Sequence, residues 1–148
     1  MKGYIPQDSN AMLEKFVNCL MVDWKKTVAR RILNTCFEEL KTMWQKDPKA
    51  AFEKAIYNVM PTIEVRPKRV WGAVYQIPVE VPEKRQLFLA VGWILNSARN
   101  KKWMPMHKRL AIEINDALSD AGWAFKKKEE VYKMAQANKA FAHFAKYR

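Results

Sequence analysis

The chain has 148 residues, 49% of them hydrophobic, and its 27 lysines and arginines against 15 acidic residues give a formal net charge of +12. This length and hydrophobic content predict a single domain over residues 1–148 with a sizeable core, and the charge predicts a polyanionic partner. Charged residues interrupt every apolar run before the roughly 20 residues that a membrane-spanning helix needs, so the pattern favours nucleic acid over a membrane.

The first part of the chain carries three predicted helices. Ser9 or Asn10 can cap the first helix, whereas Asp47 followed by Pro48 suits the start of the third. Met60 and Pro61 end the third helix. The apolar positions that recur at helical spacing are Leu13, Phe16, Val17, Leu20 and Met21, then Ala29, Leu33, Phe37, Leu40 and Trp44, then Phe52, Ala55, Ile56 and Val59.

The period of the apolar residues then changes from helical to alternating, which predicts two strands of a hairpin at about residues 62–82. Prolines at positions 67, 78 and 82 cannot donate to a ladder, so a two-stranded ribbon that protrudes from the helices fits better than a central sheet. The predicted tip, residues 66–72, combines basic side chains with an aromatic ring, a pairing that suits contacts with phosphates and bases.

Three further helices are predicted after the hairpin, around residues 87–98, 110–121 and 131–144. The predicted fold is therefore mainly α, a six-helix bundle-like domain with a two-stranded β-hairpin inserted between helices three and four. The last helix follows a run of lysines and is typical of RNA docking rather than catalysis. Its predicted buried face comprises Val131, Met134, Ala135, Asn138, Phe141 and Ala142.

Basic residues gather in five groups near the ends of these elements. Any one group could be an ordinary solvated patch, but the five together, unmatched by acidic runs, predict a multi-point RNA footprint. The groups are Lys25, Lys26, Arg30 and Arg31; Arg66, Lys68 and Arg69; Lys84 and Arg85; Arg99, Lys101, Lys102, Lys108 and Arg109; and Lys126, Lys127 and Lys128.

The residues that could carry catalysis are sparse. Cys19 and Cys36 lack a CxxC partner and are predicted to be free and buried, so no metal site is expected. His107 and His143 lie far apart in sequence, and no nucleophile and base or Gly-rich phosphate loop occurs near them. Acidic residues at 113, 116 and 120 share one helix face but suit structural or solvated roles better. We predict no enzyme activity, no cofactor and no small-molecule substrate.

Several ordered segments resemble bacterial-type small-subunit ribosomal protein seven over nearly the whole chain. They cover residues 15–26, 58–65, 69–81, 93–99, 109–113 and 126–144, and residues 134–144 read Met-Ala-Gln-Ala-Asn-Lys-Ala-Phe-Ala-His-Phe. The resemblance implies a structural constituent of the small subunit that binds the 3′ major domain of ribosomal RNA and nucleates assembly of the head. It also implies that neighbouring head and platform proteins are partners.

The same resemblance implies two kinds of RNA contact. Ribosomal RNA would bind the basic groups, most directly around residues 25–26, 66–69 and 99–102. Transfer RNA in the exit site and messenger RNA would approach the hairpin tip and the end of the chain. The residues of this second set are Val70, Trp71, Gly72, Tyr75, His143, Lys146 and Arg148. A free-standing RNA-binding regulator that uses the same basic surface is the alternative.

The chain departs from the family pattern in two respects. Tryptophan replaces glycine at two positions, and the basic arm at the N-terminus is short. Trp24 stands where the family has glycine before paired lysines, and Trp71 replaces one glycine of the hairpin turn. Trp71 either stacks on a nucleotide or a neighbouring protein, or covers the hairpin base. Lys2 is the main remnant of the family's basic arm. These departures and the eight methionines favour a mitochondrial ribosome, with the bacterial cytoplasm or a plastid as alternatives.

Overall fold

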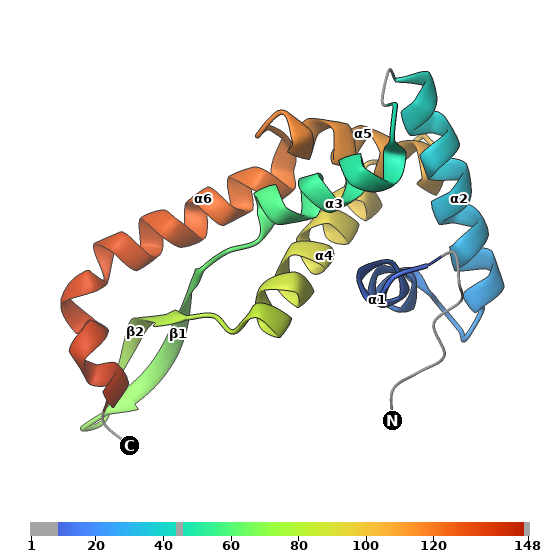
Figure 1. Cartoon of the computed structure of the whole chain (residues 1–148). Helices are drawn as coiled ribbons and strands as arrows, with labels where there is room; N and C mark the ends of the chain where they lie inside the picture. The colour runs from blue at the N-terminus through green and yellow to red at the C-terminus, as the bar shows by residue number, and fades with distance from the viewer. Residues whose placement is uncertain (1–8, 44–45, 147–148) are drawn as a thin grey trace.

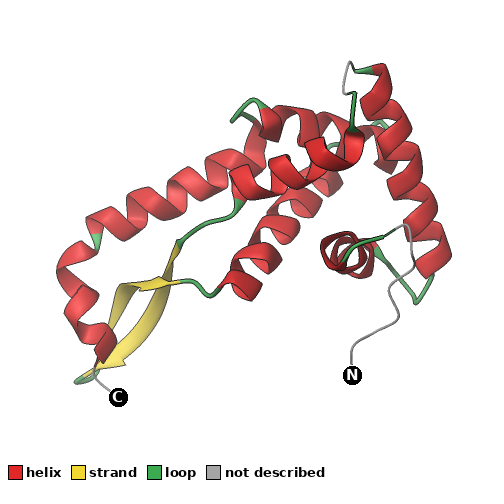
Figure 2. Cartoon of the chain, in the orientation of Figure 1, coloured by secondary structure: helices red, strands yellow, loops and turns green. Residues whose placement is uncertain are grey.

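The computed structural model describes residues 9–43 and 46–146, which form six α-helices, a β-hairpin and a C-terminal 3-10 helix (Figures 1 and 2). This arrangement confirms the mainly α fold and the place of the hairpin between the third and fourth helices. The elements are α1 (Ala11–Leu20), α2 (Lys26–Thr42), α3 (Pro48–Val59), β1 (Ile63–Val70), β2 (Ala73–Glu80), α4 (Glu83–Asn100), α5 (Met106–Leu118), α6 (Gly122–Ala137) and η1 (Lys139–Lys146).

Two helices begin at side-chain caps, which satisfy backbone amides that have no partner within the helix. Asn10, and not Ser9, caps α1, because its side-chain oxygen accepts a hydrogen bond from the Leu13 amide at 2.8 Å. The Asp47 carboxylate accepts from the amides of residues 49 and 50 at 3.1 and 3.2 Å, and Pro48 occupies the first turn of α3. Both caps agree with the sequence prediction.

The hydrophobic core lies among helices α1 to α5. Phe16 of α1 meets Phe52 of α3 edge to face, with ring centroids 4.9 Å apart. Helix α5 packs against α2, α3, α4 and α6, so it is the central helix of the body. Side chains that are almost fully buried in this core include Phe16, Phe52, Ile56, Leu40, Ile94, Leu110 and Ile114.

The hairpin extends from the body at the end of the molecule opposite α2 (Figure 1). Its antiparallel register runs from Ile63 opposite Glu80 to Val70 opposite Ala73. The turn has two residues, Trp71 and Gly72, with φ of 48° and 83°. Two successive positive φ values are the geometry of a type I′ turn, whose twist matches that of the strands.

The predicted helix at residues 131–144 is correct only as far as Ala137. Asn138 ends α6, and its side-chain amide donates to the Met134 carbonyl at 2.8 Å. Such a local side-chain bond competes with continuation of the helix. The chain then turns back as η1 along the hairpin (Figure 1). Met134, predicted on the buried face, is 46% exposed, whereas Ala135 is buried.

The two thiols differ in burial, although both cysteines are free. Cys36 is fully buried in α2, and burial, with a smaller contribution from nearby Glu39, raises the pKa of its thiol to about 12. Cys19 is half-buried, so the prediction of burial is correct for Cys36 alone. Over residues 9–43 and 46–146, no helix is long and apolar enough to cross a membrane.

Candidate RNA-binding surface

The predicted cations divide into those that face solvent and those that hold the fold together. The first set, which we call the exposed cations, makes no side-chain hydrogen bond or ion pair within the described residues. Each can therefore contact a phosphate without giving up an internal partner. The exposed cations are Lys25, Arg31, Arg69, Lys84, Lys102, Lys108 and Lys126.

The second set is organised by three buried carboxylates, the first of which is Glu14 in α1. Its carboxylate lies 2.9 Å from the Lys26 Nζ and accepts two hydrogen bonds from Arg30 Nη2 at 3.0 and 3.1 Å. Burial raises the pKa of the Glu14 carboxyl, but the hydrogen bonds and charges of the two cations outweigh burial, so the pKa lies below its usual value. Both cations are thereby fixed at the junction of α1 and α2.

Glu64, buried in β1, performs the same task at the base of the hairpin. One carboxylate oxygen pairs with Arg66 of the same strand, and the other lies 3.3 Å from Arg85 Nε in α4. The Arg85 guanidinium also lies 5.6 Å from the ring centroid of Phe88. Arg85 therefore ties the protruding hairpin to the helical body, whereas Arg66 pairs with Glu64 within β1.

Glu113 of α5 is fully buried and is the third such carboxylate. Its Oε2 lies 2.9 Å from Lys101 Nζ, and its Oε1 accepts a hydrogen bond from the Ala124 amide at 3.0 Å. Asp116 lies 3.5 Å from the same ammonium. Because these contacts join α5 to the start of α6 and to the α4–α5 loop, the carboxylates of this helix face act in an ion-pair network that fixes three elements.

The remaining predicted cations contact backbone carbonyls or a neighbouring acid. Arg99 donates to the Cys19 carbonyl at 3.2 Å, which links α4 to α1. Lys128 donates to the Asn58 carbonyl at 2.7 Å, which links α6 to α3. These bonds neutralise no charge, so the cations remain available to a polyanion nearby. Other bonds to backbone carbonyls are those of Arg109 with Met104 and of Lys68 with Phe144 and Ala145. Lys127 instead forms an exposed ion pair with Glu130.

The hairpin and the end of the chain lie side by side. The residues that transfer RNA and messenger RNA are expected to approach come from these two segments. The Tyr75 ring of β2 packs at 5.2 Å from the rings of both Phe141 and Phe144 in η1. Val70 is buried, and Gly72 is exposed at the tip. Trp71 is almost fully exposed, so it does not cover the hairpin base.

The C-terminal members of that set lie beside this aromatic contact. His143 is exposed, and its Nδ1 lies 2.8 Å from the Ala140 carbonyl oxygen. Lys146 is the last residue of η1, and Arg148 lies outside the described residues. The structure therefore places His143 beside the Phe144 ring that packs against the hairpin, a proximity that the apolar spacing of either segment does not predict.

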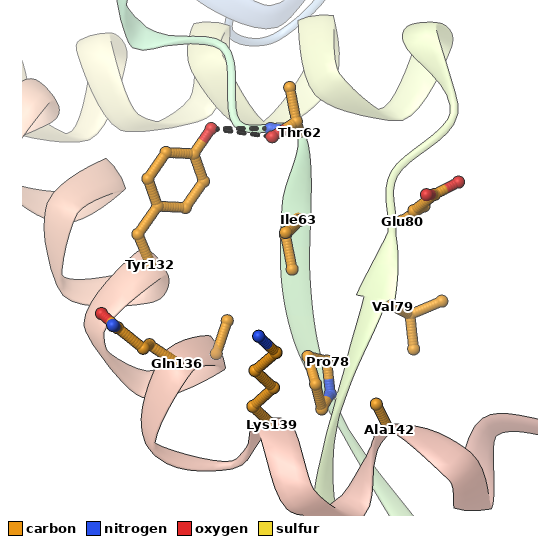
Figure 3. Close-up of a pocket in the computed structure, with 10 residues that line it drawn as sticks. Thr62, Ile63, Pro78, Val79, Glu80, Tyr132, Gln136, Lys139 and Ala142 are labelled. Atoms are coloured by element: carbon orange, nitrogen blue, oxygen red, sulfur yellow. Dashed lines mark hydrogen bonds between the residues drawn. The ribbon is translucent and has the colours of Figure 1, made fainter.

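An apolar groove that the sequence did not predict lies between the hairpin, α6 and η1 (Figure 3). Its volume is about 460 Å³. At one end, the Tyr132 hydroxyl accepts a hydrogen bond from the Thr62 amide and lies 3.0 Å from the Thr62 hydroxyl. Its lining is Thr62, Ile63, Pro78, Val79, Glu80, Tyr132, Ala135, Gln136, Lys139 and Ala142. The groove has no set of convergent acids or bases suited to chemistry.

The sequence that forms this helical body and protruding hairpin matches the model of a known protein family. The sequence model of the family described as ribosomal protein S7p/S5e matches residues 4–139. The chain belongs to the S7p/S5e family of ribosomal proteins. The family description names ribosomal proteins.

Relatives of this S7p/S5e chain match it over nearly their whole length and carry the name small ribosomal subunit protein uS7. The protein of Dictyoglomus thermophilum is 48% identical over 143 residues, which cover 95% of this chain and 92% of the relative. That of Pseudothermotoga lettingae is 51% identical over 138 residues (93% and 89%), and that of Thermotoga maritima is 45% identical over 146 residues (97% and 94%). All three organisms are bacteria, so these relatives support the bacterial alternative and give no support to a mitochondrial origin.

Proposed function

We propose that this protein is a structural constituent of the small ribosomal subunit that binds the 3′ major domain of its ribosomal RNA. The observation that carries the proposal is membership of the S7p/S5e family across residues 4–139, a range that reaches from before α1 to the start of η1. The net charge of +12 and the exposed cations support the same function. Binding would stabilise a folded junction of RNA helices and so nucleate assembly of the subunit head.

Electrostatics and rigidity account for how the protein would bind. The exposed cations come from the turns and ends of several elements, so they can meet phosphates of several RNA helices at once. Glu14, Glu64 and Glu113 hold further cations in fixed positions. Side chains that are already ordered lose less entropy when RNA binds. Shape and the geometry of the junction would therefore dominate over base sequence.

The joined end formed by the hairpin tip and η1 would face the ligands of the ribosome. Trp71, Gly72 and His143 are exposed there, next to the packed ring of Tyr75. We propose that this end approaches transfer RNA in the exit site and messenger RNA on its exit path, with neighbouring head and platform proteins around it. We also propose a bacterial ribosome as the setting, because the similar proteins come from bacteria.

Sedimentation of a lysate on a sucrose gradient at low and high salt tests the proposed function. We expect the protein to co-migrate with the small subunit at both salt concentrations, because many phosphate contacts act together. A lysate of the source bacterium is the sample, and antibodies to the protein detect it in each fraction. Migration as free protein at both salt concentrations would contradict the ribosomal role and would favour the free-standing RNA-binding regulator.

A further inference from the structure

Three tryptophans share a conformation that their side chain disfavours. Trp24, Trp71 and Trp103 have φ of 60°, 48° and 74°. The left-handed region brings Cβ close to the following carbonyl oxygen, and for a bulky residue such a value is a genuine outlier. Each of the three lies in a turn: between α1 and α2, at the hairpin tip, and between α4 and α5.

The other residues with positive φ are of types that tolerate it. Within the described segments they are Asp23, Asp120, Gly72 and Gly122. Glycine lacks the Cβ that clashes, and aspartate tolerates the left-handed region because its short polar side chain can bond locally. The three turns with tryptophan therefore have the backbone of glycine turns and the side chain least suited to them.

Packing does not compensate for the disfavoured backbone. The side chains of Trp24, Trp71 and Trp103 are 91%, 90% and 98% exposed. An exposed indole gains none of the burial that normally makes tryptophan stabilising. Trp93 is the contrast within the same chain, because it lies in helix α4 and packs against the core. An indole thus has a structural role at position 93 and none at the three turns.

The composition also shows more tryptophan and less glycine than is usual. The chain has six tryptophans and four glycines, whereas average usage of about 7% glycine would give about ten. A UGA codon is read as tryptophan under some genetic codes and as glycine under others, so one gene can specify either residue. We propose that the codons for positions 24, 71 and 103 are UGA and are decoded as glycine in the source cell, so that the native protein carries glycine at these three turns.

Glycine at positions 24, 71 and 103 would change how the turns meet RNA, a consequence that rests on the proposed function. Trp24 directly precedes Lys25, and Trp103 directly follows Lys102; both lysines are exposed cations. Glycine at these turns leaves room for the RNA backbone to approach the main-chain amides beside each cation. The contact would then be a close approach of phosphate to backbone, and not stacking of an indole on a base.

The gene and the native protein give the first test. We expect UGA at all three codons and UGG at the codon for Trp93. Peptides from the protein isolated from its own cell should carry glycine at positions 24, 71 and 103 and tryptophan at position 93. A UGG codon at any of the three positions, or a native peptide with tryptophan there, would overturn the proposal. Neither result depends on whether the protein binds RNA.

Recombinant variants give the second test. We expect the triple variant Trp24→Gly, Trp71→Gly and Trp103→Gly to raise Tm by on the order of 5 °C over the chain with tryptophan, because three strained residues are relieved. The control Trp93→Gly should lower Tm. An unchanged or lower Tm in the triple variant would contradict the proposal.

Binding of the triple variant to a transcript of the small-subunit 3′ major domain separates the two contact modes. We expect its affinity to equal or exceed that of the chain with tryptophan. If the indoles stack on bases, each lost indole should weaken binding about fivefold or more, and such a loss would overturn the glycine inference. If neither protein binds the transcript, the proposed function fails, while the codons, the native peptides and Tm still decide the identity of the three residues.

Discussion

The buried carboxylate of Glu113 joins α5 to the end of α4 through the Lys101 ammonium and to the start of α6 through the Ala124 amide. In Glu113→Gln, Lys101 loses its closest counter-charge, although the amide oxygen can still accept from the Ala124 N–H. We expect the free energy of unfolding to fall by about 3 kcal/mol, the lower end for breaking a buried pair, because the lysine side chain is 28% exposed. Urea denaturation measures the change.

The control for this prediction is Glu130→Gln, which removes the partner of Lys127 in an exposed pair on α6. Exposed pairs contribute about 0.5 kcal/mol or less, so this variant should unfold almost as the parent does. Equal losses in the two variants would show that burial gives Glu113 no special role. Both variants remove one negative charge, so net charge does not distinguish them.

Glu14 gives the fold a dependence on pH whose sign follows from its pKa. Its folded-state pKa lies below the usual value of 4.5, so the unfolded state binds the proton more tightly. Stability from Glu14 is therefore fully present above pH 4.5 and is lost as the pH falls through the lower, folded-state pKa. We expect Glu14→Gln to lose less stability than the parent over that acid range, as measured by urea denaturation at each pH. Parallel curves for the two proteins would contradict the prediction.

Residue types alone could not reveal the three buried acids. The sequence placed Lys26, Arg85 and Lys101 in basic groups, but the acid that each one pairs with lies on another element. Glu113 offered one signal, since it lies between the apolar positions of α5. A glutamate among apolar positions indicates either that the apolar face of the helix is interrupted or that the carboxylate is buried in an ion pair. Only the fold distinguishes these two cases.

The contact between the hairpin and η1 holds two elements that would be weak alone. A two-stranded ribbon is marginally stable in water, and Tyr75 anchors this one to Phe141 and Phe144. We expect Tyr75→Ala to speed hydrogen exchange in β1 and β2 by about tenfold, the equivalent of ~1.4 kcal/mol, while α5 keeps its protection. Tyr57→Ala, at an exposed tyrosine of α3, is the control. Equal exchange in both variants would contradict the anchor.

Elements with one strong period were predicted well, and the end of α6 was not. Apolar stripes in α1 to α5 and the alternation in the hairpin each have one consistent period. Phe141 and Phe144, three residues apart, suit an α-helix and a 3-10 helix equally well. The choice between them depends on Tyr75, which lies more than sixty residues earlier, so the turn at Asn138 could not be inferred from local spacing.

At the scale of the whole molecule, one core and several long-range bonds support the proposal that residues 1–148 act as a single domain. Lys128 joins α6 to α3, Arg99 joins α4 to α1, and Lys68 joins the hairpin to η1. The sequence predicted the elements and the cations, but it could not predict which cations form hydrogen bonds or ion pairs within the protein and which are exposed. That division decides which variants test RNA binding without disturbing stability.

The salt dependence of RNA binding tests whether the exposed cations are the ones that contact phosphates. Lys25, Lys102 and Lys126 are exposed cations, so Ala at all three should leave Tm almost unchanged. If each contacts a phosphate, their loss should reduce the slope of log affinity against log salt by about 2, since each neutralised phosphate contributes roughly 0.7 to 0.9. Filter binding to the 3′ major domain transcript over a salt series measures the slope.

The matched control removes the same charge from exposed lysines outside the predicted groups, at positions 41, 54 and 133. Both triple variants lower the net charge from +12 by three, so they weaken general attraction to RNA equally. A smaller slope in the first variant alone would assign the contacts to the predicted groups, because only local contacts distinguish the two proteins. Equal slopes would mean that the protein attracts RNA through its total charge, and the footprint inferred from the five groups would then be wrong.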